Sequence, residues 1–147
     1  MFKHILVPTD GSEFSMNTAR RVVSFAKEAG ARITAFNAKP EYPMPMYVEG
    51  VRVDTIAEEQ FSMLAEEKAQ HILGAVERMC NEAGVECTKL TKTNSVVYQA
   101  IIEAATECGC DLIFMAKHGH SGIGALLLGS ETNKVLTHSK IPVLVYH

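Results

Sequence analysis

Short apolar runs alternate with longer segments of helical periodicity along the whole chain. Runs rich in apolar and β-branched residues, as expected for strands of a buried parallel sheet, cover 4–8, 32–38, 111–116 and 142–146, and the weakly alternating segment 85–90 is the remaining predicted strand. Between them, apolar residues recur at helical spacing over 15–29, 54–83, 96–106 and 130–137. Strands that alternate with helices form parallel βαβ units with right-handed crossovers. The pattern therefore predicts an α/β fold: a single doubly wound open parallel five-stranded sheet with helices on both faces.

One segment follows neither period. Residues 39–50 carry three prolines within six positions, which exclude a helix and disfavour a central strand. We therefore expect an irregular surface loop here. The loop carries two tyrosines and two methionines: Tyr42, Met44, Met46 and Tyr47. Their side chains either form an apolar lid or a surface for a partner, or they are simply exposed to solvent.

Length and charge narrow the class of protein. A chain of 147 residues suits one compact domain, so we expect a single domain over 1–147. The net charge of −3 argues against a nucleic-acid partner, because non-specific binding needs a cationic face. The chain has no apolar run of about 18 residues and begins without a signal-peptide pattern, so we expect a cytoplasmic protein with no membrane partner. Its cysteines are then expected to be reduced thiols, at Cys80, Cys87, Cys108 and Cys110.

Two loops stand out by their chemistry. In doubly wound sheets the ligand lies beyond the carboxyl ends of the strands, where the winding reverses. Residues 8–12 follow the first strand and residues 117–130 follow the fourth, and both segments are rich in glycine and polar residues. The two loops share one crevice if those strands are neighbours, which periodicity alone leaves open.

The segment 116–130 is rich in glycine and leads from a strand into a helix. Glycines let backbone N–H groups approach phosphate oxygens, and a helix start favours an anion. Ser130 either reaches a phosphate with its hydroxyl or caps the helix of an ordinary loop. No Gly-Lys-Ser/Thr occurs, so the segment is not a Walker P-loop.

In three places the chain resembles the universal stress protein family. Gly119, nine residues and then Gly129-Ser130 fall in register with that family's nucleotide motif. The start, 5–12, and the end, 140–145, resemble its opening strand and turn and its closing strand. The resemblance implies a sheet ordered 3-2-1-4-5, a homodimer formed through the C-terminal strand 142–146, and a role as a regulator or sensor in the stress response.

The resemblance also implies an adenine nucleotide: ATP, or AMP or ADP, with or without Mg²⁺. It places Asp10 on the ribose or adenine side and Ala38 where the backbone meets adenine, whereas Gly119, Gly129 and Ser130 line the phosphates. The full set of candidate nucleotide-binding residues is Pro8, Thr9, Asp10, Ala38, Ala116, His118, Gly119, Gly129, Ser130 and Glu131.

Three of these residues carry alternatives. Ala116 replaces the first glycine of the motif, and its methyl clashes only if the residue needs a positive φ. Glu131 repels phosphate unless it points away or meets the phosphate through Mg²⁺; otherwise it is a favourable acid in the first turn of a helix. Asp10 is a ligand group, an Asx-turn residue or both.

We expect no metal site formed by protein side chains alone and no catalytic residue. His118 and His120 have no carboxylate or thiol at a telling spacing, so with Lys117 they serve as polar lining of the phosphate site. The sequence offers no general base, arginine finger or carboxylate pair for Mg²⁺, which limits the expected activity to slow ATP hydrolysis. Two alternatives remain: a nucleotide-free dimer that binds an unknown protein partner, and a slow ATPase or phosphotransferase.

Overall fold

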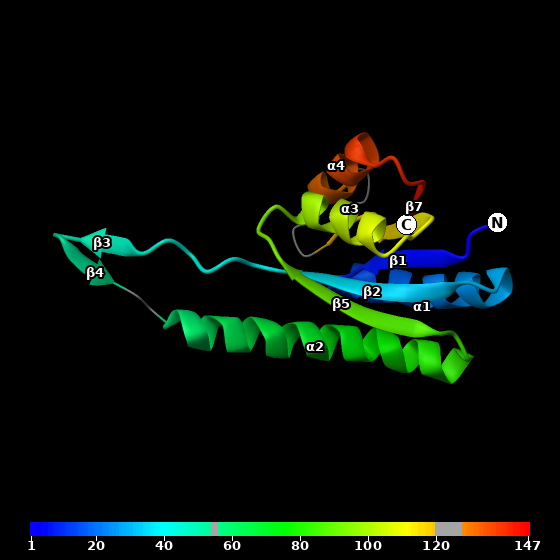
Figure 1. Cartoon of the computed structure of the whole chain (residues 1–147), viewed down its shortest axis with the longest axis horizontal. Helices are drawn as coiled ribbons and strands as arrows, with labels where there is room; N and C mark the ends of the chain where they lie inside the picture. The colour runs from blue at the N-terminus through cyan, green and yellow to red at the C-terminus, as the bar shows by residue number, and fades with distance from the viewer. Residues whose placement is uncertain (54–55, 120–127) are drawn as a thin grey trace.

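Five parallel strands form the predicted sheet in a computed structural model that describes residues 1–53, 56–119 and 128–147 (Figure 1). The strands are β1 (His4–Pro8), β2 (Arg32–Lys39), β5 (Cys87–Thr93), β6 (Leu112–Ala116) and β7 (Val143–Tyr146). Their order across the sheet is β5-β2-β1-β6-β7. This is the predicted 3-2-1-4-5 order, and it confirms that the first and fourth strands of the sheet are neighbours.

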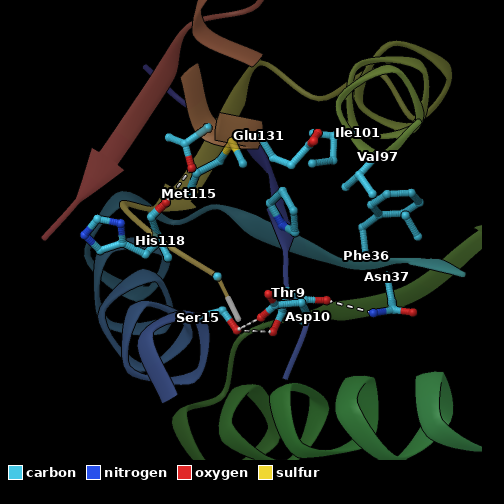
Figure 2. Close-up of a pocket in the computed structure, with 15 residues that line it drawn as sticks. Thr9, Asp10, Ser15, Phe36, Asn37, Val97, Ile101, Met115, His118 and Glu131 are labelled. Atoms are coloured by element: carbon cyan, nitrogen blue, oxygen red, sulfur yellow. Dashed lines mark hydrogen bonds between the residues drawn. The ribbon is translucent and has the colours of Figure 1, made fainter. Parts of the chain in front are cut away.

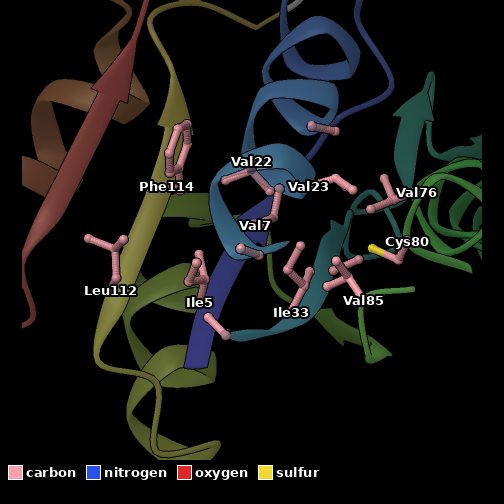
Figure 3. Close-up of a cluster of buried hydrophobic side chains, with 14 of the residues drawn as sticks. Ile5, Val7, Val22, Val23, Ile33, Val76, Cys80, Val85, Leu112 and Phe114 are labelled. Atoms are coloured by element: carbon pink, nitrogen blue, oxygen red, sulfur yellow. The ribbon is translucent and has the colours of Figure 1, made fainter. Parts of the chain in front are cut away.

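Two helices cover each face of this sheet. α1 (Glu13–Ala29) and α2 (Glu58–Ala83) pack on one face, whereas α3 (Val97–Glu107) and α4 (Ser130–His138) pack on the other. β1 serves both cores, because successive side chains of a strand point to opposite faces. Ile5 and Val7 join the cluster under α1 and α2, shown in Figure 3, and Leu6 joins the cluster under α3 and α4.

The last residues of the segment 39–50, predicted as an irregular loop, form the first strand and the turn of a β-hairpin, which corrects that expectation. β3 (Met46–Val48) pairs antiparallel with β4 (Val51–Val53). Glu49 and Gly50 between them both have positive φ, 52° and 78°, as a two-residue hairpin turn with the twist of the strands requires. The three prolines all precede the hairpin, so they do not interrupt its ladder. Figure 1 shows the hairpin projecting far from the sheet.

The longest helix begins later than predicted. Residues 54–55 lie outside the described part of the chain, and α2 starts at Glu58 with Ala57 as its N-cap. The Tyr42 hydroxyl donates a hydrogen bond to the Ile56 carbonyl at 2.7 Å, so this carbonyl faces the preceding segment instead of a helical turn. Only residues from Ala69 onward are buried in α2, and its first turns extend beyond the sheet (Figure 1). No described helix has the length and apolar character needed to cross a membrane.

The other boundaries lie within three residues of their predicted positions. The largest of these differences is in β5, which starts at Cys87 instead of residue 85 and ends at Thr93. Gly84 adopts the left-handed conformation at the end of α2, and the Val85 N–H bonds back to the Cys80 carbonyl. Val85 therefore belongs to the helix cap, which delays the strand.

Asp111 joins the two central strands at the edge opposite the glycine-rich loop. Its carboxylate accepts backbone N–H bonds from Lys3 at 2.8 Å and from His4 at 3.1 Å. Partial desolvation acts to raise the pKa of Asp111, but the N–H groups of Lys3, His4 and Asp111 itself, together with the charge of His4, hold the pKa below its ordinary value. The charged form of this side chain is therefore the one that stabilises the fold.

We predict that Asp111→Asn lowers the free energy of unfolding at neutral pH, because both N–H groups lose a charged acceptor and one of them then faces an amide NH2 group instead of an oxygen. A carboxyl with a depressed pKa in the folded state contributes fully above its unfolded pKa of about 3.9 and loses this contribution as pH falls further. Urea unfolding should be measured for the two proteins from pH 7 to pH 3. The difference in their free energies of unfolding should be constant above about pH 5 and should shrink below about pH 4. A difference independent of pH would contradict this assignment.

The two halves of α2 should respond differently to the same substitution. Leu73 is fully buried against the sheet, so Leu73→Ala should lower the free energy of unfolding by about 2–5 kcal/mol. Leu64 lies in the exposed first turns, and Leu64→Ala should change it by less than about 1 kcal/mol. Urea unfolding at low protein concentration measures both without a contribution from association. Equal losses would show that the first turns also pack on the body.

Candidate functional site

A cavity of about 290 Å³ opens at the carboxyl ends of β1, β2 and β6, between them and the first turns of α3 and α4 (Figure 2). It lies where the winding of the sheet reverses, as predicted. The residues that line it are Pro8, Thr9, Asp10, Ser15, Phe36, Asn37, Ala38, Val97, Ile101, Met115, Ala116, His118, Gly119, Glu131 and Thr132.

Eight of the ten residues predicted from the sequence line this cavity; seven come from the ends of β1, β2 and β6 and the loops that follow, and one comes from the first turn of α4. They are Pro8, Thr9, Asp10, Ala38, Ala116, His118, Gly119 and Glu131. In the described part of the chain, Gly129 and Ser130 lie beside the cavity without lining it. Residues 120–127, with the predicted His120, lie outside the described residues.

Asp10 forms the Asx turn that the sequence suggested. Its Oδ1 accepts the Ser12 N–H at 2.9 Å and the Ser15 hydroxyl at 3.0 Å. The Thr9 hydroxyl joins the same network through the Ser15 hydroxyl, 2.9 Å away. Ser12 in turn caps α1, because its hydroxyl accepts the Ser15 N–H at 3.2 Å. The loop after β1 is therefore held in a fixed shape at the start of α1.

Both motif glycines lie in close approach to neighbouring atoms. A Cβ on Gly119 would collide with Oδ2 of Asp10, so the loop after β6 meets the loop after β1 directly at this position. A Cβ on Gly129 would lie 2.9 Å from the backbone oxygen of Lys117, which accepts the Gly129 N–H at 2.9 Å. Neither glycine has a positive φ. Their role is to leave space for the backbone.

Ala116 fits the structure without strain. It is the last residue of β6 and is not among the described residues with positive φ, so the anticipated clash of its methyl does not arise. Its carbonyl accepts the Thr132 hydroxyl at 3.0 Å, which ties the end of β6 to the first turn of α4. The methyl replaces the motif glycine at little cost.

The predicted helix cap at Ser130 is wrong by one residue. Gly129 is the N-cap of α4, with a non-helical ψ of 146°, and Ser130 is the first helical residue, with an exposed side chain. As a glycine, Gly129 offers no side-chain oxygen to cap the helix. The first N–H groups of a helix have no acceptor within the helix, so the start of α4 presents donors beside the cavity.

Glu131 has a structural partner that no sequence pattern indicated. Its Oε2 accepts the Tyr98 N–H at 3.0 Å, in the first turn of α3, and its Oε1 lies 3.5 Å from the Lys134 ammonium. Within the described chain, the N-cap residue Val96 makes no capping hydrogen bond with its side chain. Glu131 therefore caps α3 from the neighbouring helix, and this also confirms it as an acid in the first turn of α4.

The wall that faces these loops is apolar. Phe36 comes from β2, Met115 from β6, and Val97 and Ile101 from α3, as Figure 2 shows. Next to them, the Asn37 amide donates to the Thr9 carbonyl at 2.9 Å and holds the ends of β1 and β2 together. The cavity thus has an apolar slot at one side and backbone donors with polar loops at the other. It suits a ligand with a flat apolar ring and a polar or anionic end.

His118 is buried and packs edge-on against Phe14, with the ring centroids 5.5 Å apart. Its Nδ1 has no hydrogen-bond partner among the described residues. No group of three or more metal-binding side chains occurs in the part of the chain that the structure describes. This histidine lines the cavity as a packed polar side chain.

A family model described as "Universal stress protein family" matches residues 1–147. The chain belongs to the universal stress protein family. Universal stress protein MJ0531 of Methanocaldococcus jannaschii is 33% identical and covers 99% of this chain and 82% of its own length. A universal stress protein of Thermus aquaticus is 30% identical over 99% of this chain and 98% of its own length.

Solved structures share the fold of this universal stress protein. MJ0577 of M. jannaschii superposes with a TM-score of 0.80 at 23% identity, over 99% of this chain and 95% of that one. A universal stress protein in complex with cAMP gives a TM-score of 0.71 at 25% identity, with 99% and 97% covered. A family member from Arabidopsis thaliana with AMP bound superposes with a TM-score of 0.68 at 14% identity, over 97% of this chain and 90% of that one.

Several lining residues escaped the sequence analysis. Phe36 and Asn37 precede the predicted Ala38 on the same strand, so the strand end itself was a usable signal. Met115 likewise precedes Ala116. Val97 and Ile101 of α3 carried no such signal, because their helical spacing shows a buried face without showing which strand ends that face covers.

We predict that Glu131→Ala lowers the free energy of unfolding by about 1 kcal/mol, because the Tyr98 N–H loses its acceptor at the start of α3. Glu131→Gln keeps an oxygen at the same place and should recover most of the loss. Urea unfolding of the two variants beside the wild-type protein measures the difference. If the alanine variant had the same free energy of unfolding as the wild type, the contact between the two helices would not contribute to stability.

Proposed function

We propose that this universal stress protein binds an adenine nucleotide, with ATP as the expected form, in the cavity at the ends of β1, β2 and β6, and that it acts as a regulator or sensor in the stress response. The observation that carries the proposal is the pairing of an apolar slot with the start of α4 across one crevice. These two surfaces match the two ends of a nucleotide, which are a flat base and an anionic phosphate chain.

The adenine fits the apolar side. Phe36, Val97 and Ile101 give a dry wall for the ring, and the backbone at Ala38 lies at the end of β2, where it can meet the edge of the base. The volume of about 290 Å³ is at the lower limit of small-molecule pockets, which suits a nucleoside enclosed by the cavity with its phosphates directed outward. Family structures with cAMP, AMP or dAMP bound support a base of this kind.

The phosphates fit the glycine side. Gly119 and Gly129 leave the backbone bare, and the first N–H groups of α4, from Ser130 onward, are available as donors. The exposed Ser130 hydroxyl lies at the same helix start. Asp10 and Glu131 are acids on the cavity wall, so we propose that a polyphosphate binds together with Mg²⁺, which offsets their repulsion.

Binding rather than turnover suits the way the acids are used. Asp10 accepts hydrogen bonds from Ser12 and from Ser15 at the start of α1, and Glu131 caps α3. A carboxylate held by structural donors is a weak general base, since those donors stabilise its charged form. We therefore propose that the protein is a nucleotide-dependent regulator located in the cytoplasm and that it hydrolyses ATP slowly at most. We further propose a homodimer through 142–146, because β7 is the edge strand of the sheet on that side.

The two motif glycines test the phosphate site. We predict that Gly119→Ala and Gly129→Ala each weaken ATP binding at least about tenfold, since a Cβ at either position displaces the loop from the helix start. Gly74→Ala is the matched control, because its Cβ would meet only Arg78 Nη1 at 3.6 Å, an ordinary contact on α2. Calorimetric titration of all four proteins with Mg-ATP measures the effect, and thermal unfolding confirms that each variant is folded.

Native mass spectrometry of the purified wild-type protein complements this titration. A bound adenine nucleotide that is lost in both loop variants would support the site. Wild-type affinity in both variants would contradict the phosphate assignment. A wild-type protein that neither retains nor binds a nucleotide would favour the nucleotide-free dimer instead.

A further inference from the structure

An arm leaves the body of the molecule between β2 and the buried half of α2. It comprises residues 40–53 and 56–64, and it contains the β3–β4 hairpin at its tip and the first turns of α2 (Figure 1). The proposed nucleotide site uses none of these residues.

The arm is held in place by specific contacts at its base. The Tyr42 hydroxyl bonds to the Ile56 carbonyl, and the Tyr42 ring meets Phe61 edge-on with centroids 5.5 Å apart. The Lys39 ammonium lies 2.6 Å from the Glu66 carboxylate, and the Glu41 N–H donates to Ser95 at 3.0 Å. Prolines stiffen the limb that leads to the hairpin. The hairpin is thus carried outward by a defined stem.

The hairpin has one apolar face. In the register of the ladder, Met46 pairs with Val53 and Val48 pairs with Val51, and these four side chains share a face. Tyr47 and Arg52 pair on the opposite face. The four apolar side chains are between 47% and 70% exposed. A two-stranded hairpin is marginal alone and needs a further strand or a helix against its apolar face.

A second apolar patch lies on the same arm. Met63 and Leu64, in the first turns of α2, are 68% and 50% exposed. Beside Met63 is a shallow hollow between α2 and the end of β2, and its other lining residues are polar or charged: Lys39, Ser62, Glu66, Glu67 and Gln70. The helix surface at Met63 and Leu64 is the type of element that a hairpin needs for its apolar face.

The size of the two patches fits an association between identical chains. Six half-exposed apolar side chains would remove roughly 400 Å² of apolar surface per chain. Because interfaces are about 57% apolar, this corresponds to about 700 Å² per chain, close to the 800 Å² or so per partner of a standard interface. A twofold axis lets each hairpin cover the helix patch of the other chain, so both patches are buried at once.

We propose that the arm is a homotypic interface: the apolar face of the hairpin, formed by Met46, Val48, Val51 and Val53, packs on Met63 and Leu64 of a second copy of this chain, and the second copy reciprocates. The hairpin then gains the helical partner that its own chain does not place against it in the described residues. This interface is separate from the edge strand β7, so the two can operate in the same assembly.

The test is the oligomeric state of the full chain by sedimentation over a range of concentrations. Val48→Thr with Val51→Thr keeps the β-branched shape and makes the hairpin face polar. This double variant should halve the mass of the wild-type assembly at the same concentration and weaken association at least about tenfold. The double variant Met63→Gln with Leu64→Gln, which makes the helix patch polar, should also halve the mass and weaken association to a similar extent. Tyr47→Thr, on the opposite face of the hairpin, is the matched control and should leave association unchanged.

Amide hydrogen exchange distinguishes this interface from the edge strand. In the wild-type protein, the amides of β3 and β4 should be protected at high concentration and lose protection on dilution. Protection that is independent of concentration would overturn the proposal in favour of a lid on the same chain. Equal masses of the wild-type protein and the Val48/Val51 variant at all concentrations would overturn it in favour of a different protein partner.

Discussion

The parallel pairing of β1 with β6 is the constraint on which the site depends. Because the two strands run side by side in the same direction, the loops that follow them must emerge at the same edge of the sheet. The loops come so close that a Cβ at residue 119 would collide with the Asp10 carboxylate and force it to move. Asp111 fixes the same pair of strands at the other edge through the N–H groups of Lys3 and His4. The crevice is therefore a consequence of strand order, and the side chains only shape it.

The acids of the site show how structural and binding roles combine. Asp10 shapes the loop after β1, and Glu131 caps α3 from α4. Each uses its charge to accept backbone N–H groups, which fixes the walls of the cavity but adds negative potential to them. An anionic ligand must then be stabilised by donors of another kind. The start of α4, the bare backbone at the glycines and a divalent cation are the sources of positive potential consistent with this arrangement.

Most of the sheet could be predicted from the sequence, because buried parallel strands are continuous apolar runs that turn residues interrupt. The strand order came from the resemblance to the family, since periodicity contains no information on adjacency. The hairpin was missed for a physical reason: strands of three residues are too short to show a period, and the prolines beside them dominate the composition. The cap of α4 was misplaced because serine is usually the better cap, whereas here the close approach to Lys117 requires glycine. Glu131 illustrates the limit of local patterns, because its partner Tyr98 lies 33 residues away on another helix.

The arm and the cavity both begin at the end of β2, which raises the question of how strongly they are coupled. Asn37 and Ala38 line the cavity, and the next residue, Lys39, holds the base of the arm through its ion pair with Glu66. This pair is partly exposed, and such pairs contribute at most about 1 kcal/mol. The hydrogen bond from Glu41 to Ser95 adds a similar amount. A ligand can transmit to the arm no more free energy than these contacts hold, so the coupling is limited to about 1–2 kcal/mol. Occupancy of the cavity would then adjust association through the arm by at most about 5- to 30-fold rather than switch it on or off.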